Sequence, residues 1–70
     1  MYRLRWANET GGDWLHGGTK YIDLDLAELT AMMAFDDELV EKEDIVQAID
    51  DEDEIVEEWD YQDFEDWKEQ

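Results

Sequence analysis

Carboxylates are the side chains in this sequence whose number and spacing suggest chemistry. Of the 70 residues, 23 are Asp or Glu, and 18 of these lie between Asp36 and Glu69. Only Lys42 and Lys68 oppose them there, and the centre of the stretch is an unbroken acidic run over residues 50–54. Three kinds of chemistry deserve testing against this pattern: acid–base catalysis, cation binding and electrostatic recognition of a basic partner.

Acid–base catalysis is not expected. Two carboxylates divide the roles of acid and base only when different environments inside a pocket separate their pKa values. Here the acids are adjacent in sequence, and no segment is long enough to build a cleft. His16 is a candidate general base, but the chain contains neither Ser nor Cys to serve as its nucleophile. The sequence therefore predicts no enzyme, no catalytic residue and no cofactor.

A specific metal site is not expected either. An EF-hand loop that began at Asp51 would place Asp53 correctly at the third position. Its fifth position would be Ile55, which offers no ligand, and its sixth would be Val56 where glycine makes the sharp turn. The single His and the lack of Cys also exclude the usual zinc sites. We expect only loose association with divalent cations.

Electrostatic recognition remains, and the distribution of charge supports it. The net charge is −18, of which residues 1–35 carry −2 and residues 36–70 carry −16. A charge that served solubility or a saline environment would be spread more evenly. Disordered acidic segments are poor in aromatic residues, whereas this one contains Trp59, Tyr61, Phe64 and Trp67. The acidic half is therefore predicted to be folded, with a dense carboxylate surface.

Such a surface has the charge spacing to replace nucleic acid in a basic groove. Duplex DNA carries one negative charge per ~1.7 Å of axis. Side chains on one face of a strand repeat every ~6.6 Å, and i,i+4 neighbours on a helix lie ~5–6 Å apart. The predicted partner-binding residues are Asp36, Asp37, Glu38, Asp50, Asp51, Glu52, Asp53, Glu54, Glu57, Glu58, Asp60 and Trp67, the last as an exposed aromatic anchor.

In this charge density residues 36–69 resemble the phage-encoded acidic DNA-mimic inhibitors, which include anti-restriction and anti-CRISPR proteins. The similarity covers composition and has no alignable motif. It implies an inhibitor that occupies the nucleic-acid-binding site of a bacterial defence complex, a CRISPR effector or restriction system, and binds no nucleic acid itself. The alternatives are an acidic adaptor or antitoxin-like protein that binds a basic partner without mimicry, and an acidic surface with no specific partner.

The elements that must position these residues form a single domain of 70 residues. We expect an α+β fold, a two- to three-stranded antiparallel sheet with one or two helices on one face. Alternation over residues 2–7 predicts a strand that turns Arg3 and Arg5 away from the core. Residues 8–19 hold all four glycines and predict a loop, which joins a second strand at 20–24 in a wide hairpin.

Helical spacing of apolar residues predicts a helix over 26–35, with Asp25 as N-cap and Glu28 completing a capping box. The Met32–Met33 pair is expected to fill the core. Acidic residues at 36–38 disfavour a helix C-terminus, so a break is expected there. A second helix or pair of turns is predicted to follow up to Ile49, with four inward side chains: Leu39, Val40, Val46 and Ile49.

Residues 54–61 fit either a helix or a strand. The strand is favoured, as a third strand beside the first, because it would bring Glu54, Glu58 and Asp60 near the two arginines. The tail from residue 62 is expected to form a last helical turn or to order only on a partner. No membrane span or signal segment is recognisable. We therefore expect a cytoplasmic protein, as a monomer or small homo-oligomer.

Overall fold

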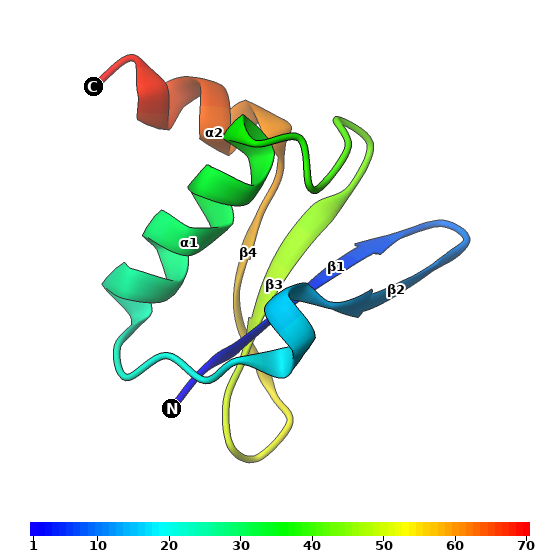
Figure 1. Ribbon diagram of the computed structural model, residues 1–70, viewed down its shortest axis with the longest axis vertical. Coiled ribbons are helices and arrows are strands. Elements are labelled where there is room, and N and C mark those ends of the chain that lie inside the picture. Colours follow the sequence, from blue (N-terminus) through cyan, green and yellow to red (C-terminus); the bar gives the residue numbers. More distant parts are fainter.

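A four-stranded antiparallel sheet carries two helices on one of its faces in the computed structural model, which describes residues 1–70 (Figure 1). The strand order is β2-β1-β3-β4. The elements are β1 (Arg3–Asn8), β2 (Gly11–Trp14), the 3-10 helix η1 (Leu15–Gly18), α1 (Leu24–Asp36), β3 (Ile45–Ile49), β4 (Ile55–Trp59) and α2 (Tyr61–Lys68). The predicted α+β fold is confirmed, with four strands in place of two or three.

Strand β1 is confirmed, but its hairpin partner differs from the prediction. The chain reverses after Asn8, whose Oδ1 accepts hydrogen bonds from the Thr10 amide and hydroxyl at 2.8 and 2.7 Å. It then returns as β2 through the first glycine pair. A Cβ on Gly12 would stand 2.2 Å from the Trp6 carbonyl oxygen, so only glycine allows this close approach. These glycines therefore belong to a strand and not to a wide loop.

The strand predicted at residues 20–24 is wrong. Only an isolated bridge between Tyr2 and Tyr21 forms there. Strand β2 has already paired with the edge of β1, and the chain after η1 leads directly into α1. The side chain of Asp23 caps this helix by accepting a hydrogen bond from the Leu26 amide at 2.7 Å. The predicted cap at Asp25 is therefore also wrong, by two residues.

Helix α1 buries its small residues. Ala27, Ala31 and Ala34 face the core together with Met32 and Phe35, and the alanines let the helix approach the sheet closely. Met32 is fully buried as expected, but Met33 is exposed. The helix ends at Asp36, which confirms the predicted break.

The helix or turns predicted up to Ile49 are wrong over their second half. Residues 45–49 form β3, which lies between β1 and β4 at the centre of the sheet. Val46 and Ala48 face the helices, whereas Gln47 and Ile49 lie in register with the arginines of β1 on the opposite face. Val40 is buried as predicted, but Leu39 is exposed. A run of five residues is too short to show its period, so the central strand was mistaken for helix.

Strand β4 confirms the preference for a strand within residues 54–61 over Ile55–Trp59, whereas Tyr61 already begins α2. The neighbour of β4 is β3 and not β1. The predicted partners of Arg3 and Arg5, which were Glu54, Glu58 and Asp60, are therefore wrong. Arg3 binds Asp53 at 2.8 Å, and Arg5 donates two hydrogen bonds to the Gln47 side chain at 3.0 and 2.6 Å. Gln47, which is 7% exposed, is thereby satisfied on the face of the sheet that no helix covers.

The tail forms α2, a complete helix that packs on the core. Asp60 and Asp63 make a reciprocal capping box at its start. Buried Phe64 stacks on Phe35 with ring centroids 5.8 Å apart. Neither α1 nor α2 combines the length and apolar composition needed to cross a membrane.

Candidate functional site

The fold distributes the predicted partner-binding carboxylates over three surfaces. The first, which we call the acidic turn, is the β3–β4 connection at residues 50–54. The second, the acidic loop, begins at Asp36, the last residue of α1, and covers residues 36–43. The third is an acidic hollow between α1, β4 and α2. Every carboxylate predicted for partner binding is exposed except Asp50, which is half-buried.

Asp50 gives the acidic turn its shape. Its Oδ1 accepts hydrogen bonds from the amides of Glu52 and Glu54 at 2.8 and 2.9 Å. The Asp50 amide in turn donates to the Glu54 carbonyl at 3.0 Å. Asp53 adopts a left-handed conformation, with φ of 63°. One carboxylate of the run is therefore committed to holding the others outward.

The molecule's own cations compensate the acidic turn. The Met1 ammonium lies 3.0 Å from Asp51, Lys20 lies 3.9 Å from the same carboxylate, and Arg3 lies 2.8 Å from Asp53. These are the only ion pairs within 4.0 Å in the structure. The hydrogen bond and charge of the Met1 ammonium, with smaller contributions from Lys20 and Arg3, lower the pKa of Asp51 below its ordinary value. The net charge available to a partner at this turn is therefore much smaller than the sequence suggests.

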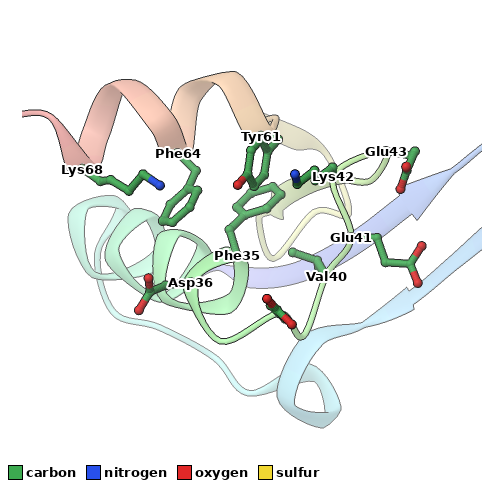
Figure 2. A pocket seen from close by; sticks show the side chains of 10 residues that line it. Phe35, Asp36, Val40, Glu41, Lys42, Glu43, Tyr61, Phe64 and Lys68 are labelled. Carbon is green, nitrogen blue, oxygen red and sulfur yellow. The ribbon is translucent and has the colours of Figure 1, made fainter.

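The acidic loop borders a hollow of about 520 Å³ with an aromatic floor (Figure 2). Phe35, Tyr61 and Phe64 line it. The Lys42 ammonium lies 5.3 Å from the Tyr61 ring centroid, and the Lys68 ammonium lies 5.0 Å from that of Phe64. Neither lysine forms an ion pair, so both cations of the acidic half rest on rings and leave the nearby carboxylates unpaired.

Four carboxylates stand around this aromatic hollow. In Figure 2 the side chains of Asp36, Glu41 and Glu43 point away from the rings, whereas Lys42 lies across Tyr61. The four are Asp36, Glu38, Glu41 and Glu43. Their exposure and their lack of ion pairs make this rim a second region of available negative charge.

The acidic hollow has a volume of about 390 Å³ and no basic residue in its lining. Five acidic residues from three elements line it, and they are Glu28 of α1, Glu57 and Glu58 of β4, and Asp63 and Asp66 of α2. The Glu58 carboxylate also accepts a hydrogen bond from Gln47 at 3.4 Å on the other face of the sheet, and Asp63 Oδ2 accepts one from the Asp60 amide at 2.9 Å. Trp59 and Trp67 line the same hollow. None of the acidic residues that line this hollow forms an ion pair with a cation of the chain.

Sequence reasoning missed three members of the acidic hollow. Glu28 was assigned to a capping box, and Asp63 and Asp66 were not among the predicted residues. The i,i+3 spacing of Asp63 and Asp66 was the sequence feature that could have placed these two carboxylates side by side on a helix. Two predicted residues have structural contacts: Asp60 caps α2 through the Asp63 amide at 2.9 Å, and Trp67 is half-buried, stacked on Phe64 at 6.2 Å. Trp67 therefore offers a partner only part of its ring.

The groups considered for other chemistry lie apart from the acidic hollow. His16 is exposed in η1, with φ of 50°. Carboxylate oxygens of Asp50, Glu52 and Glu54 lie within 4.8 Å of one another, the one arrangement in the fold that would suit a cation. Oδ1 of Asp50 accepts two backbone hydrogen bonds. Exposed acidic groups are common without a bound ion, so this arrangement alone assigns no metal.

No protein family, curated protein or solved structure matches this chain in comparisons of its sequence and fold.

Proposed function

We propose that this protein is an acidic DNA-mimic inhibitor, which occupies the nucleic-acid-binding site of a bacterial defence complex and blocks DNA binding. The observation that supports this most strongly is the acidic hollow, which five acidic residues and no basic residue line. A carboxylate surface of this kind attracts the Lys and Arg side chains that line a DNA-binding groove. Because it repels phosphate, the protein itself should bind no nucleic acid.

The placement of the cations also supports the proposal. Three of the chain's positive groups form ion pairs, and all of these are at the acidic turn. The acidic hollow and the acidic loop therefore keep their charge for a partner. On α2, Asp63 and Asp66 present neighbouring charges at the i,i+3 helical spacing of ~5–6 Å. Charge in such an array steers association and sets its dependence on salt.

An acidic adaptor or antitoxin-like protein is the second candidate. It is favoured by the exposed aliphatic residues of the molecule, which nucleic acids do not present, and which include Leu26, Leu29 and Met33. An adaptor would bind a basic partner beside its DNA site, so that DNA and this protein would be bound together. The two candidates therefore differ in whether binding is mutually exclusive.

Capture of the binding partner from a lysate is the first experiment, because it identifies the complex on which the two candidates can be compared. Immobilised protein is exposed to a bacterial lysate at low salt, and bound proteins are eluted with a salt gradient. The proposal predicts a nucleic-acid-binding complex whose affinity for this protein falls steeply with salt, as its affinity for DNA does. Retention of only proteins that bind no nucleic acid would contradict it.

Paired variants then locate the binding charge. Glu57→Gln with Glu58→Gln removes two carboxylates of the acidic hollow, and Glu9→Gln with Asp13→Asn removes the same charge from the β1–β2 hairpin. We expect the first pair to weaken binding to the captured complex about tenfold or more, and the second by less than about threefold, because only the first lies in the proposed contact. Equal losses would indicate that net charge alone drives binding.

A further inference from the structure

An aliphatic stripe runs along the outward face of α1. Ile22 precedes the N-cap of the helix, and Leu26, Leu29 and Met33 follow within the helix at intervals of three and four residues, so these three lie on one side of it. The exposed fractions of the four residues, in chain order, are 73%, 42%, 46% and 44%. No element of the fold covers them. The stripe is separate from the acidic hollow, to which α1 contributes Met32 and Glu28 from another side.

The opposite side of α1 already supplies the core. Ala27, Ala31, Ala34 and Phe35 are buried against the sheet and α2, so the helix is apolar on both sides. A helix with this pattern is normally covered on both sides. Exposed aliphatic side chains gathered in one place commonly mark a contact with another molecule, and spacing at i, i+3 and i+7 is typical of a helix that anchors in a partner.

The charges beside the stripe decide which partner fits. At 3.6 residues per turn, Asp25 and Asp36 lie beside Leu29 on the surface of the helix. Both are exposed. Helix α1 contains no Lys or Arg. A second copy of the chain packed on this face would therefore bring carboxylates against carboxylates, in two molecules that each carry −18. A partner with basic residues around an aliphatic centre would pair with both features.

We propose that the stripe docks a basic amphipathic helix of the partner, with aliphatic side chains against Leu26, Leu29 and Met33 and Lys or Arg beside Asp25 and Asp36. The proposal rests on the proposed function in requiring a basic partner. It adds that this contact holds at salt concentrations that screen the acidic hollow, because burial of aliphatic surface does not depend on charge.

The test uses the whole ¹⁵N-labelled chain and two synthetic peptides at about 0.15 M salt. One peptide is a helix with leucines on one face and lysines on the other; the second has the same composition in scrambled order. We expect the amphipathic peptide to shift the amide resonances of α1, centred on Leu29, and to bind about tenfold more tightly than the scrambled one. Equal binding of both peptides, or shifts confined to the acidic turn or hollow, would overturn the proposal.

Matched variants separate the stripe from exposed apolar surface in general. Leu29→Gln with Met33→Gln should weaken the amphipathic peptide about tenfold. Ile55→Gln with Val56→Gln, which alters β4 residues of similar exposure, 47% and 41%, should leave its affinity unchanged. Circular dichroism confirms that each variant is folded before it is titrated. Equal losses in the two variants would overturn the assignment to α1.

Sedimentation equilibrium of the chain alone tests whether a second copy of the chain binds the stripe instead. A monomer at about 0.5 M salt, where repulsion is screened, agrees with the proposal. A dimer that Leu29→Gln abolishes would assign the stripe to a second copy and overturn the proposal.

The two proposals can fail separately. A chain that displaces DNA from its target without binding the peptide would refute only the stripe's role. A chain that binds the peptide and leaves DNA in place would refute only the mimicry.

Discussion

At the scale of single residues, the carboxylates divide into those that hold the fold together and those that face solvent without a partner. Asp44 is 6% exposed and accepts hydrogen bonds from the Asn8 side chain at 2.8 Å and the Glu41 amide at 2.9 Å. Asp23, Asp50 and Asp60 accept backbone amides at a helix start or a turn. In the sequence these residues look the same as the exposed Glu43 or Glu65, since only the fold shows which amides each carboxylate reaches.

Asp51 provides a test at this scale. The Met1 ammonium, first by its hydrogen bond and then by its charge, lowers the pKa of Asp51 below 3.8. Acetylation of the N-terminus removes both effects, so the pKa of Asp51 should rise toward that ordinary value. Carboxyl ¹³C NMR titration of the free and acetylated protein measures the change. An unchanged midpoint would show that the ammonium does not hold this carboxylate.

The same contact has a consequence for stability. A depressed pKa means that the folded state binds the proton of Asp51 less readily than the unfolded chain does. The contribution of this pair is therefore present above about pH 4 and is lost as the pH falls through the folded-state pKa of Asp51. Because the group is exposed and screened by solvent, the contribution should be small.

At the scale of elements, the end of α1 shows an acidic residue where glycine is usual. The Leu39 amide donates to the Ala34 carbonyl at 2.9 Å and the Glu38 amide to the Phe35 carbonyl at 3.2 Å. These two bonds define a Schellman motif, which places its penultimate residue in the left-handed region. Glu38 occupies that position with φ of 61°. The helix thus ends in a conformation that costs a glutamate about 1–2 kcal/mol.

Glu38→Gly should therefore stabilise the protein by about 0.5–1 kcal/mol, after the greater flexibility of glycine in the unfolded chain is subtracted. Glu38→Gln is the matched control, because it removes the charge and keeps the strain. Urea unfolding of the three proteins measures the difference. If the two variants are equally stable, repulsion among carboxylates and not backbone strain determines the effect of Glu38.

Sequence patterns predicted elements well where a period was long enough to recognise. The alternation around Leu4 and the apolar spacing of α1 identified a strand and a helix correctly. Strand β2 was missed because the need for glycine at Gly12 arises from the approach of Trp6, which only the paired strands reveal. Strand β3 was missed because five residues of Ile, Val, Gln and Ala show no clear period. Tertiary pairing determined both outcomes.

At the scale of the whole molecule, two of the five acidic residues of the hollow, Glu57 and Glu58, were among the residues predicted from the sequence, and the balance of charge was not predicted. Exposed carboxylates on β4 were anticipated from the sequence. The neutralisation of the acidic turn was not, because it joins Met1 and Arg3 to residues 50 positions away. The acidic hollow is likewise lined by residues from three elements, α1, β4 and α2. Contacts between residues so far apart in the chain depend on topology, which local patterns do not specify.

The excess of negative charge should make stability depend on salt. Repulsion acts over ~30 Å at 0.01 M salt and over ~8 Å at 0.15 M. With 23 acidic residues against five basic ones, screening should remove more repulsion than attraction, and Tm should rise between these two conditions. Thermal unfolding followed by circular dichroism measures it. A constant or falling Tm would mean that the ion pairs of the acidic turn outweigh the repulsion.

Mutually exclusive binding tests the central proposal, that this carboxylate surface replaces DNA. The captured complex is loaded with a fluorescent DNA duplex and titrated with the protein while the anisotropy of the duplex is followed. DNA mimicry predicts that the anisotropy falls to the value of free DNA. It also predicts that Glu57→Gln with Glu58→Gln raises the protein concentration required for this displacement about tenfold or more. Labelled protein and labelled DNA bound together on one complex would contradict it.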